Sequence, residues 1–414
     1  MPSPTLASPA FAGLRTDSPQ KRHAMRYYIS VLANHLTVSK EFNSFLTAFL
    51  PMAMESIALS DVLLALATGH LSLVDESQKI AALETRSKAI QNLAASLTTQ
   101  ADDLAHQETN AAACLAFVIY ETGVGDHGAW HTHLKGTQQI IKSAKTYQQG
   151  KLLTGAEAFK TSTEGQWILR NFAYHDIIAS VTLQTKPLLE EDILDGITDV
   201  TDSCLGVATS LLRIVSRTCC LDKDTALDDS ISDKERQRRQ HLFLTSYAQL
   251  EDEILAWRCQ PEADAGLASL AYAYRNAALV ILYRLKRNRL RSDFFRNRDN
   301  SYESIAGGFD EVQAQIQSIV TDTLDLFSSI PVAAAPESAM LFPVFIIGGE
   351  VLEQDQIDAV RARLRQMVAQ RQFRNLSQAW EVLEDLWESR NTAHDSSADW
   401  TQFLTASGQN LLLT

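Results

Sequence analysis

Apolar residues recur at spacings of three and four along most of the chain from residue 21 onward, and few runs alternate as strands do. This periodicity is that of α-helices packed on a core through one face. The segment 61–73, DVLLALATGHLSL, is apolar on nearly every face, which predicts a central, buried helix. Residues 79–97 instead carry a single apolar stripe, which predicts a helix with one buried face and one solvent-exposed face. The stripe comprises Ile80, Leu83, Ile90, Leu93 and Leu97.

Similar patterns predict a helix around Trp130 and further helices over 110–121, 165–184, 204–217, 233–257, 269–290, 311–329, 355–372 and 376–393. The connections are short, and no repeat of 34 or 40 residues is visible. We therefore expect an all-α fold, a single multi-helix bundle or superhelix of a dozen or more helices spanning 21–414. Residues 1–20 hold four of the ten prolines and predict a disordered tail.

Composition and charge narrow the class of protein. Of the 414 residues 45% are hydrophobic and 21% charged, as in soluble globular proteins. A net charge of -13 argues against a surface built to surround nucleic acid. Five scattered cysteines without a C-x-x-C pair suit a reducing compartment, with no disulfide and no structural zinc. The most apolar stretch, 330–349, contains Glu337 and three prolines, which excludes a membrane-spanning helix there.

The stretch ETGVGDHGAWHTHLKG places three histidines within seven positions. On a helix over about 127–145, His127 and His131 lie within about 40° of each other, but His133 points away, so the three cannot share a metal. We expect His127 and His131 to face water and His133 to lie at the edge of a core-facing stripe. That stripe comprises Trp130, Leu134, Thr137, Ile141 and Ala144.

Two acidic features could carry chemistry. The run DDSISD, with Asp228, Asp229 and Asp233, resembles the aspartate-rich motif with which all-α terpene cyclases bind Mg²⁺ and a diphosphate. The second metal triad of such an enzyme is not found, so a solvated turn before a helix capped by Ser232 and Glu235 is the alternative. The adjacent His175 and Asp176 cannot orient each other on a helix, which favours a buried polar pair over an acid/base dyad.

Two basic stretches stand out from the acidic background, 234–241 and 283–298. Such stretches serve as nuclear-import signals or contact phosphate backbones, although a solvated helix end has the same composition. The candidate residues of the second stretch are Arg284, Lys286, Arg287, Arg289 and Arg291.

Several segments together resemble the helical regulatory domain of fungal zinc-cluster transcription factors, from about Arg22 to Leu386. The segments are 58–73, 114–141, 170–189, 271–285, 340–364 and 373–387. Within them, the signature positions of the resemblance are Trp130, His133, Leu134, Gly136, Pro343, Gly348 and Gly349.

The resemblance implies a nuclear, non-enzymatic transcription regulator. The six-cysteine zinc cluster of the family is missing, since no cysteine precedes Cys114. DNA would then be reached only through a missing or separate module, and no cofactor is expected in this chain. The partners implied are the transcription machinery or another transcription factor, with a small-molecule effector and a homodimer as further hypotheses. The alternatives are a Mg²⁺-dependent prenyl-diphosphate enzyme and a non-catalytic protein-binding scaffold.

Overall fold

A computed structural model describes residues 18–99, 103–125, 128–227, 231–296, 302–393, 398–408 and 410–414. The chain forms two compact units, divided after Leu169, and helix α10 (Thr163–Leu183) runs through the division. The all-α prediction is confirmed. Of the tail predicted at 1–20, residues 1–17 fall outside the described part, and helix α1 already begins at Pro19.

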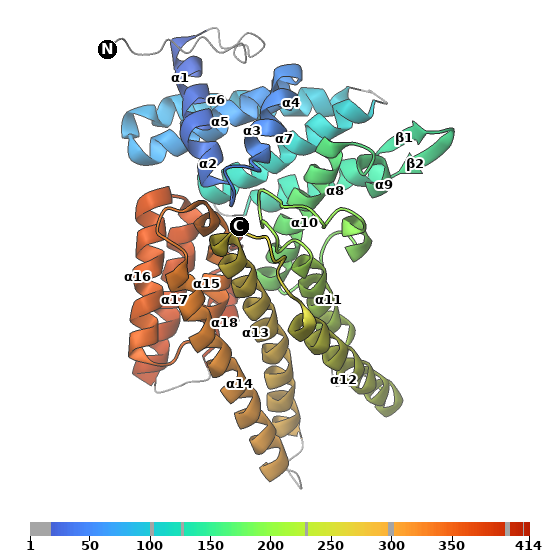
Figure 1. The fold of residues 1–414 in the computed structure, drawn as a ribbon, viewed down its shortest axis with the longest axis vertical. Coiled ribbons are helices and arrows are strands. Elements are labelled where there is room, and N and C mark those ends of the chain that lie inside the picture. Colours follow the sequence, from blue (N-terminus) through green and yellow to red (C-terminus); the bar gives the residue numbers. More distant parts are fainter. Residues whose placement is uncertain are drawn as a thin grey trace. The chain divides into compact units, whose positions relative to one another are not determined.

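The first unit consists of helices and one short hairpin (Figure 1). Its α-helices are α1 (Pro19–Tyr27), α2 (Ala33–His35), α3 (Ser44–Thr47), α4 (Phe49–Glu55), α5 (Ile57–Val74), α6 (Lys79–Thr98), α7 (Leu104–Gly123), α8 (Trp130–Ser143) and α9 (Ala156–Phe159). A π-helical turn, Tyr28–Leu32, joins α1 to α2.

Helix α5 is the centre of this unit, as its all-round apolar sequence predicted. Ser56 caps it by accepting a hydrogen bond from the amide of Leu59 at 3.3 Å. Its residues from Ala58 to Ala67 are buried except Ser60, and both α6 and α7 pack against it. Asp61 is buried on this helix and accepts a hydrogen bond from Asn92 of α6.

Helix α6 contradicts the expected direction of its apolar stripe. Ile80, Leu83 and Leu97 are 72%, 64% and 48% exposed, so most of the stripe faces solvent. The helix contacts α5 through small and polar residues instead, because alanines let the two helices approach closely and Thr85 hydrogen-bonds to Thr68. Periodicity identified the helix but not the face that packs.

The hairpin was not predicted. Strand β1 (Lys145–Gln148) pairs antiparallel with β2 (Lys151–Thr154). Both turn residues, Gln149 and Gly150, have positive φ, which is the geometry of the two-residue turns that suit the twist of a hairpin.

The second unit begins within α10 and contains most of the long helices. They are α11 (Leu211–Asp224), α12 (Asp233–Ala256), α13 (Ala265–Arg296), α14 (Tyr302–Ser329), α15 (Leu341–Gly348), α16 (Gln354–Arg371), α17 (Arg374–Ala393) and α18 (Trp400–Ser407). Short 3₁₀ turns lie at Glu191–Leu194 and Ala335–Ala339. The predicted cap of α12 is confirmed, since Ser232 Oγ accepts from the amide of Glu235 at 3.3 Å.

Helices α13 and α14 form a long hairpin, and α13 also packs on the wholly buried α15 (Figure 1). Helix α11 begins seven residues later than the sequence pattern predicted. The reason is a tight loop, closed by backbone hydrogen bonds between Asp202 and Gly206, in which the Asp202 carboxylate accepts from the Cys204 amide and from Arg170.

Two helices are long and apolar enough to cross a membrane by length and composition, Ile57–Val74 and the part of α13 from Ala265 to Arg291. Of their most apolar windows, 61% and 67% of the residues are buried inside the protein. They are the core helices of the first and second unit, and a buried core helix meets the same criterion.

Candidate functional site

A cavity of about 190 Å³ lies within the second unit, between α10, α11, α13 and α18. Its wall includes Ser180, Thr218, Cys219, Arg284, Trp400 and Thr401. All but Thr401 are less than 9% exposed, so the inner wall is part of the core of this unit.

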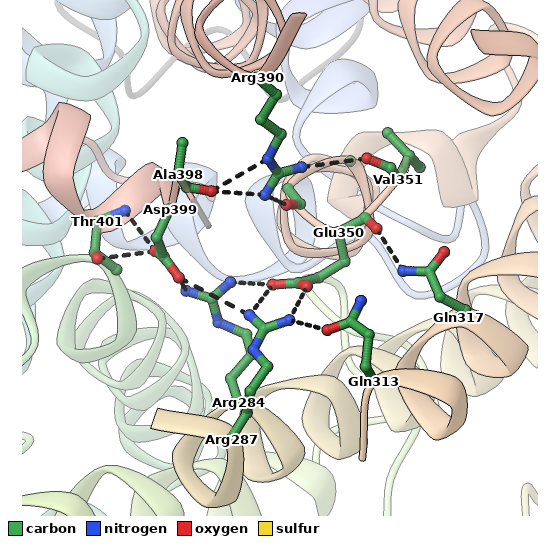
Figure 2. Close-up of polar contacts among 12 residues, drawn as sticks. Arg284, Arg287, Gln313, Gln317, Glu350, Val351, Arg390, Ala398, Asp399 and Thr401 are labelled. Atoms are coloured by element: carbon green, nitrogen blue, oxygen red, sulfur yellow. Dashed lines mark hydrogen bonds and ion pairs between the residues drawn. The ribbon is translucent and has the colours of Figure 1, made fainter. Parts of the chain in front are cut away.

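Arg284 connects the cavity wall to a buried group of charges (Figure 2). Its Nη2 donates to both carboxylate oxygens of Asp399 at 2.7 Å, and its Nη1 donates to Glu350. Such two-pronged pairing of a guanidinium with carboxylates fixes both position and orientation. Arg284 therefore holds the start of α18 and the end of α15 in one arrangement on α13.

Arg287, one turn further along α13, completes this charge cluster. Its Nη1 and Nη2 donate to the two oxygens of Glu350 at 2.6 and 2.9 Å, and Nη1 also donates to Gln313 at 2.9 Å. Two arginines thus face two carboxylates, so the cluster formed by Arg284, Arg287, Glu350 and Asp399 is neutral as a whole. A buried group of charges is tolerated only when it is paired in this way.

The ionised form of both carboxylates is the stable one. Burial raises the pKa of Asp399, but attraction to Arg284 and hydrogen bonds from Thr401 outweigh it and lower the pKa to about 2. Burial also opposes ionisation of Glu350, and the positive charges of Arg284 and Arg287 still lower its pKa. The charge cluster therefore stays charged at neutral pH.

Arg390 of α17 fastens the same region through backbone carbonyls rather than through carboxylates (Figure 2). It donates to the carbonyl of Gly349 at 2.8 Å, of Val351 at 3.2 Å and of Ala398 at 2.9 Å. The end of α15 and the residue two before α18 are thereby tied to one side chain.

The signature residues Pro343, Gly348 and Gly349 lie here, on α15 and directly after it. A Cβ on Gly349 would come within 2.5 Å of Trp400 Cδ1, so only glycine lets the indole pack this close. A Cβ on Gly348 would likewise meet Leu383 at 2.9 Å. Pro343 is buried in the first turn of α15, where its missing N–H costs no hydrogen bond. These are packing positions that shape the wall on the Trp400 side.

Three hydroxyl groups of the cavity wall donate their protons to groups inside the protein. Ser180 donates to the Asp176 carbonyl, Thr218 to the Ile214 carbonyl and Thr401 to the Asp399 carboxylate, each at 2.8 Å. Their protons are therefore used in hydrogen bonds within the protein, and the lone pairs of their oxygens can still accept hydrogen bonds. At these three positions the wall suits a ligand group that donates a hydrogen bond.

The cysteine of this wall, Cys219, is a poor nucleophile. Burial raises the pKa of the Cys219 thiol, which keeps the sulfur protonated and a poor nucleophile. Among the described residues, no group of three His, Cys, Asp or Glu side chains is arranged to hold a metal ion. The described arrangement is thus a cavity whose wall presents three hydroxyl oxygens as acceptors.

The remaining signature residues lie on α8 of the first unit. The predicted stripe is confirmed, since its members are all buried: Trp130, Leu134, Thr137, Ile141 and Ala144. His133 lies at its edge and stacks on Phe117, with ring centroids 4.7 Å apart. Burial, aided by the positive charge of Arg86, lowers the pKa of His133 to about 4, so the ring is neutral.

The prediction that His127 and His131 face water is tested only for His131. His131 is half-buried rather than fully in water, and burial lowers its pKa. His127 lies outside the described residues, and the helix itself begins at Trp130 rather than at about residue 127. A Cβ on Gly136 would meet only Cys114 Sγ, at an ordinary 3.8 Å, so close packing does not explain this signature position.

The expectation that the basic stretch on α13 lies at the surface has to be corrected for Arg284 and Arg287. Both are buried in the charge cluster and cannot contact an import receptor or a phosphate backbone. Charge alone could not reveal this, because their acidic partners lie more than 60 residues away in the chain. Lys286, Arg289 and Arg291 are half-buried over the rings of Tyr247, Phe243 and Phe309. For these three the expected role stays a prediction.

Of the three acidic candidates, the structure describes only Asp233. Asp228 and Asp229 lie outside the described residues, and Asp233 is the exposed first residue of α12. The buried pair behaves as predicted: His175 hydrogen-bonds to Thr414 Oγ1 at 2.8 Å, whereas Asp176 accepts from the amides of Leu188 and Leu189.

A model of the fungal specific transcription factor domain matches residues 23–414, nearly the whole chain. The chain belongs to this family. The resemblance found in the sequence is thereby confirmed, and membership indicates a transcriptional regulator. Neither the curated proteins nor the solved structures contain a significant match. None of the five cysteines of this fungal specific transcription factor domain, all within the described residues, forms a disulfide.

Proposed function

We propose that the chain is the regulatory domain of a nuclear, zinc-cluster-type transcription regulator that controls RNA polymerase II transcription without catalysing a reaction. The family match over 23–414 carries this proposal. DNA is reached through a separate module or a partner factor, since the net charge of -13 disfavours direct contact of the whole surface with a polyanion.

The proposal includes a small-molecule effector bound in the cavity of the second unit. A volume of about 190 Å³ admits a small metabolite. Because the wall hydroxyls already donate their protons within the protein, they favour a metabolite with several hydrogen-bond donors, such as a polyol or an amine. A bound effector would act on Arg284 and Thr401, because both residues line the cavity and both donate hydrogen bonds to Asp399.

A tethering experiment tests the regulatory function. The full chain is fused to an unrelated DNA-binding domain and placed upstream of a reporter gene in a fungal cell. We expect reporter expression to change relative to the DNA-binding domain alone. An unchanged reporter, with the fusion present in the nucleus, would contradict the proposal.

A thermal-shift screen of polyols and amines tests the effector separately, since a ligand that binds only the folded state raises the melting temperature. Thr218→Val removes one acceptor of the wall at nearly constant volume and should weaken any hit. Thr321→Val is the matched control, because Thr321 makes the same kind of bond to the carbonyl four residues back but is exposed on α14. If both variants weaken the binding of a hit equally, the cavity is excluded as its binding site.

A further inference from the structure

Helix α6 of the first unit carries its largest apolar side chains on the outside. Ile80, Leu83, Ile90 and Leu97 are 72%, 64%, 38% and 48% exposed. Scattered exposed aliphatic residues are normal on a protein, but four on one face of one helix are unusual.

The inner face of the same helix is the more polar one. Thr85 hydrogen-bonds to Thr68 at 2.6 Å, Asn92 to Asp61 at 2.5 Å and Ser96 to Asn110 at 2.6 Å. Between these bonds the buried positions are mostly alanine. The amphipathic pattern is thus inverted relative to a helix that serves only its own core, in which the apolar stripe faces inward.

The outer residues follow the spacing of a coiled-coil seam. Positions 80, 83, 87, 90, 94 and 97 alternate steps of three and four, with the small residues Ser87 and Ala94 between the large ones. The seam extends about 26 Å at 1.5 Å per residue, and none of its six residues is charged.

We propose that this seam pairs with the α6 seam of a second copy of the chain, the two helices running antiparallel. Antiparallel pairing about the midpoint places Ile80 against Leu97 of the second copy and Leu83 against its Ala94. Ser87 then faces Ile90 of the second copy. Each central layer combines a large with a small side chain, whereas a parallel pair would place Ser87 on Ser87 and Ala94 on Ala94 and leave gaps.

The charges on α6 permit this approach. Its three basic residues are each paired within their own chain: Lys79 with Glu76 at 2.6 Å, Arg86 with Glu121 at 2.8 Å and Lys88 with Asp61 at 3.6 Å. Two copies therefore meet without unpaired positive charge along the seam. The antiparallel register also brings Glu84 beside Gln91 of the second copy, a carboxylate acceptor next to an amide donor.

The size of the patch fits a reversible dimer. Added together, the exposed fractions of the four large side chains equal slightly more than two fully exposed aliphatic side chains per copy. One helix pair of this length lies at the small end of specific interfaces, about 1,000–1,200 Å² in total. Dimerisation should accordingly depend on protein concentration.

Sedimentation of the full chain over a concentration series tests the proposal. We expect a monomer–dimer equilibrium in the unsubstituted protein and at least a tenfold weaker one in Leu83→Glu, with a nearly unchanged melting temperature because Leu83 is 64% exposed in the monomer. Leu244→Glu is the matched control, since Leu244 is similarly exposed, at 59%, but lies on α12. A protein that stays monomeric, or a dimer that both variants weaken equally, overturns the proposal.

Cysteine cross-linking tests the direction of pairing. The double variant Ile80→Cys, Leu97→Cys should form covalent dimers under mild oxidation, since these positions face each other across an antiparallel pair. Leu83→Cys alone should not exceed the background of the native cysteines. Efficient cross-linking by Leu83→Cys alone would show a parallel pair and overturn the antiparallel arrangement.

Discussion

Replacing Glu350 by glutamine tests how strongly the charge cluster holds the second unit together. The substitution keeps the size of the side chain and removes one negative charge at a position that is 2% exposed. Arg284 and Arg287 would then share Asp399 alone, which lies at 4.0 Å from Arg287. One buried positive charge loses its compensation.

The expected cost is large for a single substitution. Glu350 accepts three charge-assisted hydrogen bonds, and removing one partner of a buried ion pair costs about 3–5 kcal/mol because the other charge stays buried. For a unit of this size each kcal/mol lowers the melting temperature by roughly 2–4 °C, so Tm should fall by about 6–20 °C.

Urea denaturation followed by circular dichroism measures the effect. Glu353→Gln is the matched control: it makes the same change in charge three residues on, at an exposed position, and should stay within about 0.5 kcal/mol of the unsubstituted protein. The double variant Arg287→Met, Glu350→Met leaves the neutral pair of Arg284 and Asp399 and should be more stable than Glu350→Gln. A loss below about 1 kcal/mol in Glu350→Gln, or a double variant that is less stable still, would refute the charge-balance argument.

Three further predictions concern the signature positions. Gly349→Ala should lower stability by about 1–3 kcal/mol, because its Cβ would lie 2.5 Å from Trp400; chemical denaturation would detect this. Gly136→Ala should instead raise stability by about 0.5–1 kcal/mol in the same assay, since α8 gains helix propensity without a clash. The folded-state pKa of His133 is lowered to about 4 from 6.5, so the contribution of its neutral form to stability is complete above pH 6.5 and is lost progressively as pH falls from 6.5 through 4. His133→Gln should therefore reduce the stability lost between pH 7 and pH 5 by about 1 kcal/mol, a value discounted for partial exposure and measured by melts at both pH values.

The sequence predicted the existence of the helices better than their contacts. The central α5, the α8 stripe and the Ser232 cap follow from local patterns, and all three were predicted correctly. The inverted face of α6 could not be predicted in the same way. A stripe at helical spacing shows which residues share a face, but whether that face meets the core or a partner depends on what α5 and α7 present to it.

The cavity and the charge cluster escaped sequence analysis for a related reason. Arg284 and Arg287 lie within a dense basic run, which is the signal of a surface, and nothing local indicates that Glu350 and Asp399 will meet them. One hint was present: the two arginines are three positions apart and therefore share a face of α13, within a helix that is apolar before them.

The signature position Gly349 and the candidate effector site depend on the same contacts. Gly349 admits the Trp400 ring, Arg284 lies over that ring at 4.7 Å, and the Arg284–Asp399 pair borders the cavity. A ligand in the cavity that moved Trp400 would have to move groups whose spacing is fixed by Gly349 and by a buried ion pair. Because such packed groups shift between discrete arrangements rather than deform continuously, any response should involve α15 and α18 together, and Gly349→Ala should alter ligand affinity as well as stability.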